Sequence, residues 1–157
     1  MLIAALLACI PPTADTADTG DSGDTADTGD SATATLQLRF VLEADLIPEM
    51  AEPPVGIFRG SIYAEADATG FGPTEGAVSL LDFASDPIDL SAGGGPSAVA
   101  FSGGELEAQV IWILGCLDSD GNDCDKDDAI TVPNDNKFAI VTGPNPIDVT
   151  MELLNPS

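Results

Sequence analysis

The feature that most constrains the fold of this chain is an alternation of apolar and polar residues with a period of two. Four apolar residues occupy every second position of the first such stretch, namely Leu36, Leu38, Phe40 and Leu42. A second stretch with the same period covers residues 58–65. Because successive side chains of a strand point to opposite faces, this period predicts β-strands that bury one face.

Further candidate strands occupy residues 77–83, 98–101, 105–116, 129–132, 137–142 and 147–154. Glycine and proline turns separate them. The best helical candidate, residues 43–52, is interrupted by Pro48, which a helix interior does not tolerate. The sequence therefore predicts an all-β domain over residues 36–157, an antiparallel β-sandwich of about seven or eight strands.

Residues 13–35 read TADTADTGDSGDTADTGDSATAT, with Asp at every third position from Asp15 to Asp30. No residue in this repeat is larger than Thr, so the segment cannot bury enough apolar surface to offset the entropy lost on ordering. We expect a disordered acidic tether, in which residues 10–35 would average roughly 30 Å from end to end as a flexible coil.

A short apolar run, Met1–Ala8, precedes the tether and ends in Leu6-Leu7-Ala8-Cys9. This ending resembles the lipobox of bacterial lipoproteins. The resemblance implies a signal peptide at residues 1–8, a lipidated Cys9 at the head of the tether (9–35), and attachment to a membrane. Ile10 rather than Asp follows the cysteine, which resembles lipoproteins sent to the outer membrane or cell surface. The alternative is that residues 2–7 form a buried terminal strand; the run is too short to span a bilayer.

Charge excludes several classes of function. The chain carries 27 acidic residues against four basic ones, a net charge of −23. Such a surface repels nucleic acid and anionic lipid headgroups. The chain contains no histidine, so a Ser-His-Asp triad, a Cys-His pair and a histidine-ligated zinc site are all excluded.

One segment, CLDSDGNDCDKDD at residues 116–128, concentrates oxygen ligands. The predicted calcium ligands are Asp118, Asp120, Asn122, Asp125, Asp127 and Asp128. The spacing of the first three matches the start of an EF-hand loop, although Asp123 stands where that loop has glycine and Ala129 where it has glutamate. Carboxylates this close repel one another unless a cation lies among them. The alternative is a solvated acidic hairpin that holds no ion.

A strand ending in Trp-Ile-Leu-Gly-Cys-Leu-Asp, followed by this loop, an Asp-Asp-Ala-Ile segment and a final pair of strands, is similar to the transthyretin-like (prealbumin-like) domains of bacterial surface lipoproteins. The similarity covers roughly residues 55–154. It implies a non-catalytic module rather than an enzyme.

Three cysteines leave one unpaired in an exported protein. If Cys9 is acylated, Cys116 and Cys124 remain, and we expect a disulfide between them. The alternative is two free thiols that bind a soft metal, for which no further nitrogen or sulfur ligand is available.

These observations predict a lipid-anchored lipoprotein whose calcium-stabilised sandwich binds a protein or glycan partner or serves a structural role. Two alternatives remain open. One is a small hydrolase that uses paired carboxylates. The other is a subunit of a surface filament or envelope complex.

Overall fold

The computed structural model describes residues 33–153, whose regular structure is almost entirely strand. The strands are β1 (Ala34–Leu42), β2 (Val55–Ala64), β3 (Ala68–Thr69), β4 (Gly72–Pro73), β5 (Leu81–Ala84), β6 (Ile88–Asp89), β7 (Phe101–Leu106), β8 (Val110–Asp118), β9 (Ala129–Thr131), β10 (Lys137–Ala139) and β11 (Gly143–Leu153). Three short 3-10 turns complete this part of the chain: η1 (Ile47–Glu49), η2 (Glu65–Asp67) and η3 (Pro133–Asp135). The all-β prediction is confirmed.

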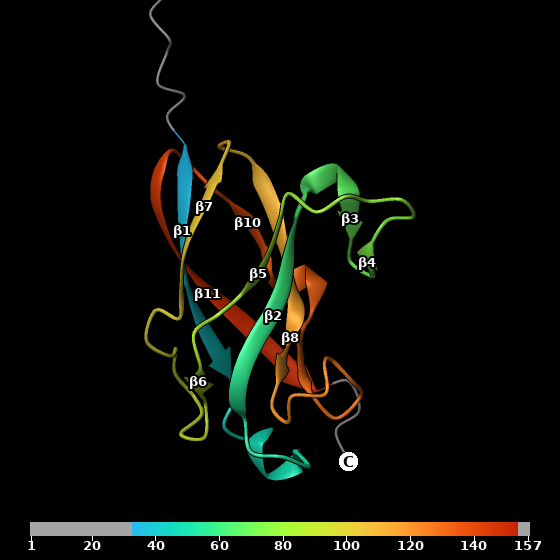
Figure 1. Cartoon of the computed structure of the whole chain (residues 1–157), viewed down its shortest axis with the longest axis vertical. Helices are drawn as coiled ribbons and strands as arrows, with labels where there is room; N and C mark the ends of the chain where they lie inside the picture. The colour runs from blue at the N-terminus through green and yellow to red at the C-terminus, as the bar shows by residue number, and fades with distance from the viewer. Residues whose placement is uncertain (1–32, 154–157) are drawn as a thin grey trace, which may run out of the picture. The chain divides into compact units, whose positions relative to one another are not determined.

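Nine of these strands form one mixed sheet (Figure 1). The strand order is β5-β2-β8-β9-β11-β1-β7, with β10 added to β8 and β6 added to β2. β3 and β4 form a separate hairpin. All pairings are antiparallel except that of β1 with β11, which run parallel with Leu38 opposite Ile147.

The expected antiparallel sandwich of seven or eight strands therefore differs from the structure. The described residues form eleven strands, one pairing is parallel, and the main sheet is continuous and nearly closed into a barrel. Alternation shows which face of a strand is buried, but it does not identify the neighbouring strand or its direction. Strand boundaries moved as well, since the candidate at 77–83 is reduced to β5 and that at 105–116 is divided between β7 and β8 by residues 107–109.

The two end strands of the sheet, β5 and β7, meet through side chains. The rings of Phe83 on β5 and Phe101 on β7 have their centroids 4.5 Å apart. Near them the Asp86 amide donates a hydrogen bond of 2.7 Å to the Ala100 carbonyl. A ring contact and one backbone bond thus bridge the two ends of the sheet, which no strand ladder joins.

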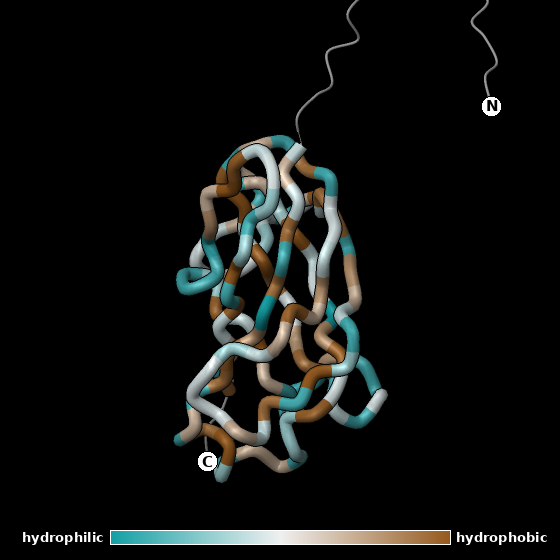
Figure 2. Tube along the Cα trace, turned by 90° about the vertical axis from the view of Figure 1, so that its left-hand side faces the viewer, coloured by the Kyte–Doolittle hydropathy of each residue, from teal (hydrophilic) through white to brown (hydrophobic). Residues whose placement is uncertain are grey.

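The core lies inside this curved sheet. Every second residue of β1, from Ala34 to Leu42, is fully buried, which is the alternation that the sequence predicted. Figure 2 shows the same alternation as brown and teal segments along the strands. The ring of Phe40 lies 4.6 Å from that of Phe58, which in turn lies 5.7 Å from Phe83. Aromatic contacts therefore link β1, β2 and β5 across the core.

Two glycines make room for the buried Phe58 ring. Gly60 on β2 and Gly115 on β8 are paired in register. A Cβ at Gly115 would lie 2.7 Å from both Phe58 Cζ and Gly60 Cα, closer than real Cβ atoms approach. Glycine is required there because the backbone and the ring already occupy that space.

β11 contains two prolines, Pro144 and Pro146, although a strand paired on both sides does not normally accept proline. The Gly143 amide donates to the Thr33 carbonyl, on the side of β1. Since alternate backbone groups point in opposite directions, the nitrogens of Pro144 and Pro146 face away from β1. There they interrupt no ladder, because β11 pairs with its other neighbour, β9, only over residues 151–153.

Asn136 joins η3 to β11 from a fully buried position. Its Nδ2 donates to the carbonyls of Val132 and Thr150, and its Oδ1 accepts the Thr150 amide. Its backbone carbonyl accepts the Ile113 amide of β8. A buried side chain thus supplies hydrogen bonds where the ladder is interrupted.

Trp112 is 5% exposed but lies outside the main cluster of buried residues. Its indole Nε1 donates to the Glu65 carbonyl at 3.3 Å, and the Lys137 ammonium lies 5.0 Å from the ring centroid. The residue is thus buried beneath η2 and Lys137 and not in the main core.

Within residues 33–153, no helix has the length and hydrophobicity needed to cross a bilayer.

Candidate functional site

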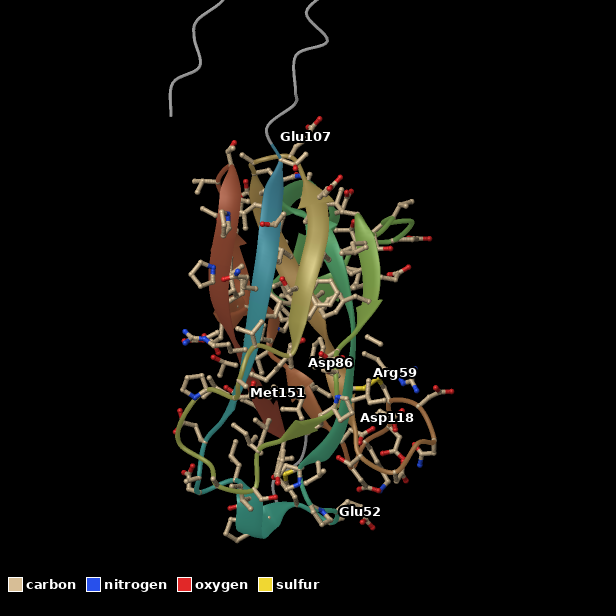
Figure 3. All side chains as sticks on the ribbon, turned by 60° about the vertical axis from the view of Figure 1, so that its left-hand side comes forward. Glu52, Arg59, Asp86, Glu107, Asp118 and Met151 are labelled. Carbon is tan, nitrogen blue, oxygen red and sulfur yellow. A yellow bond between two sulfur atoms is a disulfide. The ribbon has the colours of Figure 1, made fainter. Side chains whose placement is uncertain are left out.

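The acidic segment connects two antiparallel neighbours in the sheet. β8 leads into it and β9 returns from it, with Cys116 opposite Ile130 and Leu117 opposite Ala129. Residues 119–128 therefore form a long loop whose two ends are fixed by one ladder. Figure 3 shows this loop beside the labelled side chains of Arg59 and Asp118.

The expected disulfide is present between Cys116 and Cys124. The two Cα atoms are 5.8 Å apart, within the range of natural disulfides. Cys116 is 1% exposed, whereas Cys124 is exposed in the loop. The bond therefore pins the middle of the acidic loop to a buried position of β8.

Asp118 is buried at the start of the loop and is paired with Arg59 of β2. Arg59 Nε lies 2.8 Å from Asp118 Oδ2, and Asp118 Oδ1 accepts the Gly121 amide at 2.8 Å. The hydrogen bond from Arg59 lowers the pKa of Asp118, against an opposing effect of burial, and it raises the pKa of Arg59. Asp118 thus has a cationic partner within the protein.

Asp128 is buried at the other end of the loop and has no such cation. Its Oδ1 accepts the Ser119 amide at 3.3 Å and its Oδ2 accepts the Asp125 amide at 3.0 Å. Burial raises the pKa of Asp128, because these two hydrogen bonds only partly replace the lost hydration. This carboxylate ties the first turn of the loop to its last.

Asp120, Asn122 and Asp125 are brought together on the exposed side of the loop. Asn122 Nδ2 donates to Asp120 Oδ2 at 2.7 Å and to Asp125 Oδ2 at 3.3 Å. The Asn122 backbone amide donates to Asp120 Oδ1 at 3.0 Å. An amide donor therefore lies between two carboxylates, where it offsets part of their repulsion.

The Asp127 amide donates to Asp125 Oδ1 at 2.8 Å, but the Asp127 carboxylate is paired with Lys126, whose Nζ lies 2.8 Å from each of its oxygens. Nowhere in residues 33–153 do three or more His, Cys, Asp or Glu side chains converge as a metal site requires. The six predicted ligands thus fall into three groups. One is the trio on the exposed side of the loop, the second is the buried pair Asp118 and Asp128, and the third is Asp127, which is paired with Lys126. Cys9 lies outside the described residues.

Arg59 was missed by the sequence reasoning. It lies 59 positions before Asp118 and contacts it only because β2 and β8 pair with Ile57 opposite Asp118. Its position on a predicted strand, as one of four basic residues, was the available signal.

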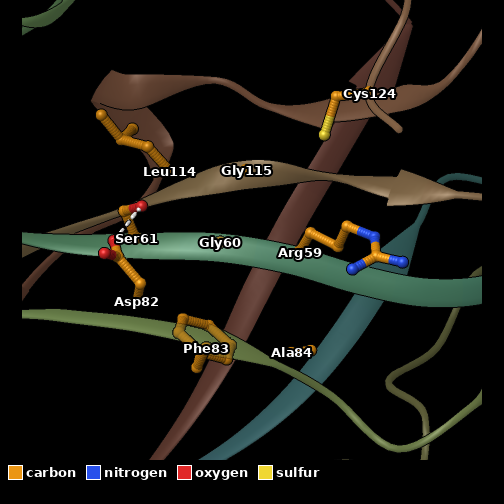
Figure 4. A pocket seen from close by; sticks show the side chains of 9 residues that line it. All are labelled: Arg59, Gly60, Ser61, Asp82, Phe83, Ala84, Leu114, Gly115 and Cys124. Carbon is orange, nitrogen blue, oxygen red and sulfur yellow. Dashed lines mark hydrogen bonds between the residues drawn. The ribbon is translucent and has the colours of Figure 1, made fainter. Parts of the chain in front are cut away.

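An open hollow of about 560 Å3 lies next to Arg59 on the outer face of β5, β2 and β8 (Figure 4). Ser61 donates a hydrogen bond of 2.6 Å to Asp82 there, which lowers the pKa of Asp82.

No family model, curated protein or solved structure matches this chain. The similarity to lipoproteins and to transthyretin-like domains therefore stays a prediction.

Proposed function

We propose that the chain is an exported, lipid-anchored protein whose β-domain is a non-catalytic binding or structural module at the outer membrane or cell surface. The observation that carries the proposal is the Cys116–Cys124 disulfide. Disulfides persist in oxidising compartments, so the bond supports export. It also accounts for two of the three cysteines and leaves Cys9 for the lipid.

Two or three acyl chains at Cys9 would hold the protein on a membrane, since a single chain anchors only marginally. The acidic repeat that follows would keep the domain away from the lipid surface, because its charges repel one another and anionic headgroups.

The test of the anchor is the intact mass of protein extracted from membranes of the producing bacterium. We expect a chain that begins at Cys9 and carries acyl groups. A Cys9→Ser variant should leave the membrane fraction, whereas Ser22→Ala, within the repeat, should not. A mature chain without acyl groups would contradict the proposal.

The acidic loop is the proposed calcium site, and the trio of Asp120, Asn122 and Asp125 supports it. If the side-chain amide of Asn122 rotated by half a turn, its Oδ1 would take the place of Nδ2. Oxygen atoms of Asp120, Asn122 and Asp125 would then face one another and could bind one cation. Hard cations bind such ligands in loops of this kind. Asp118 and Asp128 would hold the backbone of the loop in place.

Melting of the whole chain with calcium, magnesium or chelator tests this site. With a Kd of the order of 10⁻⁴–10⁻³ M, as in extracellular modules, tenfold excess calcium over Kd should stabilise the fold by about 1.4 kcal/mol. Asp120→Asn/Asp125→Asn should abolish that gain, while Asp45→Asn/Asp135→Asn, which changes two exposed acids elsewhere, should retain it. An equal gain with sodium at matched ionic strength would show a solvated acidic loop without a specific ion.

A further inference from the structure

A second hollow, of about 510 Å3, lies on the outer face of β8 and β9, beside the β3–β4 hairpin. None of its lining side chains is ionisable as a free group; they include Phe71, Leu114, the Cys124 end of the disulfide, Ile130, Val132 and Pro133. Figure 1 shows the hairpin projecting beside β8. We call this hollow the outer groove.

Phe71 at the tip of the hairpin is fully exposed, at 102% of its reference area. Local contacts hold the backbone of the hairpin tip in place. Thr69 Oγ1 accepts the Phe71 amide and donates to the Gly72 carbonyl, both at 3.2 Å. Gly70 packs so closely on Asn134 of η3 that a Cβ would lie 2.6 Å from the Asn134 Oδ1 atom. A fully exposed aromatic ring beside an apolar hollow indicates a surface that another molecule covers.

Charge decides between possible occupants. All four basic side chains of the chain are in ion pairs, namely Arg39 with Asp148, Arg59 with Asp118, Lys126 with Asp127 and Lys137 with Glu65. The remaining carboxylates leave a net charge of −23. A second copy of this chain and an anionic ligand would both be repelled.

Acidic side chains lie close to the outer groove. The groove shares Leu114, Gly115 and Cys124 with the hollow lined by Asp82 and by Arg59, whose charge is already paired with that of Asp118. Asp123, next to Cys124, is exposed on the same loop. An occupant that matches this surface presents apolar side chains to the floor and positive charges to the rim.

We propose that the outer groove docks a cationic polypeptide segment in which basic and large apolar residues are interspersed, with Phe71 as the main contact. This inference rests on the proposed function as a binding module and names the class of its partner.

The experiment measures binding by calorimetry to the full chain, produced with its disulfide and with Cys9→Ser so that no lipid is added. The probe is a ten-residue peptide of alternating lysine and leucine. Two further peptides of equal length replace lysine by glutamate or leucine by serine. The protein variants are Phe71→Ala and, as the matched control, Val141→Ala, which alters an exposed apolar residue outside the groove.

We expect the lysine–leucine peptide to bind with an affinity that falls as salt rises. Phe71→Ala should weaken binding about tenfold, as loss of a central aromatic contact does, while Val141→Ala should leave it within twofold. The other two peptides should bind at least tenfold more weakly.

Equal binding of the lysine–serine peptide would overturn the proposal, because it would show attraction to charge alone. No binding of the lysine–leucine peptide, equal binding to Phe71→Ala, or a dimer that Phe71→Ala dissociates would overturn it too. Acylation of Cys9 and the calcium response are measured on separate samples. If the peptide did not bind but Cys9 proved to be acylated, the proposal for the outer groove would fall and the proposed function would stand.

Discussion

The guanidinium of Arg59 and the carboxylate of Asp118 form an ion pair across β2 and β8, with 2.8 Å between Nε and Oδ2. The Arg59 side chain is 47% exposed, whereas that of Asp118 is 3% exposed. A partly hydrated cation thus compensates a buried acid, and the same acid holds the first turn of the loop through the Gly121 amide. The charge state of Asp118 therefore affects the stability of the loop.

Asp118→Asn should lower the melting temperature at pH 7, measured with chelator present. The folded-state pKa of Asp118 is lowered, first by the Arg59 hydrogen bond. Its contribution to stability is therefore fully present above the ordinary carboxyl pKa of about 3.9 and is lost as pH falls through the lowered value. The gap between wild type and variant should close below about pH 4. Asp45→Asn, an exposed control, should show no such convergence; a constant gap at all pH values would contradict the role of this charge.

Reduction of the Cys116–Cys124 disulfide should destabilise the domain. A closed ring of nine residues is expected to contribute about 2.6 kcal/mol by restricting the unfolded chain. Denaturant unfolding with and without reductant measures the difference. The double variant Cys116→Ala/Cys124→Ala should be insensitive to reductant. Thiol labelling of the unreduced, denatured wild type should find neither cysteine free, and labelling of both would refute the bond.

Gly115→Ala should destabilise the fold by about 1–3 kcal/mol, the usual effect of overpacking. The new methyl group would press on the Phe58 ring and on the backbone of β2. Gly95→Ala is the matched control, because no atom lies within 4 Å of its Cβ position. The denaturant midpoints of the two variants are compared. Equal midpoints would show that Phe58 and the β2 backbone move aside for the added methyl group at little cost.

Asn136→Ala should cost about 3 kcal/mol, because it removes three side-chain hydrogen bonds and leaves the partly buried Thr150 amide without its acceptor. Asp135→Ala, at the exposed neighbouring position, should change the free energy of unfolding by less than about 0.5 kcal/mol. Amide exchange at Thr150 offers a second readout and should accelerate only in the Asn136 variant. Unchanged protection of the Thr150 amide in the Asn136 variant would mean that the Asn136 side chain does not hold η3 to β11.

Much of the strand content could be predicted from the sequence, because burial of one face leaves a period of two along each strand. β1 and β11 illustrate both the success and its limit. Their alternation predicted the buried residues, but nothing in either segment indicated that the two strands pair in parallel across 109 positions from Arg39 to Asp148. Pairing direction depends on the path of the intervening chain, which no local pattern records.

The acidic loop shows the same division. Cys116 and Cys124 were identified as the pair that remains if Cys9 is acylated, and they are bonded. The grouping of the carboxylates was not predictable, because the backbone turns of the loop direct Asp118 and Asp128 toward amides and Asp127 toward Lys126. Arg59 entered the site only through the register of β2 and β8.

The contact between Phe83 and Phe101 has a consequence for how this protein behaves at high concentration. A sheet with two free ends offers unpaired amides and carbonyls to the strands of neighbouring molecules, which is a route to aggregation. Here β5 and β7 turn toward each other, and the two rings, together with the Asp86–Ala100 bond, cover the gap. Because the two ends face each other, they are less open to strands of other molecules, and crowding should favour fibrils less than it would for an open sheet.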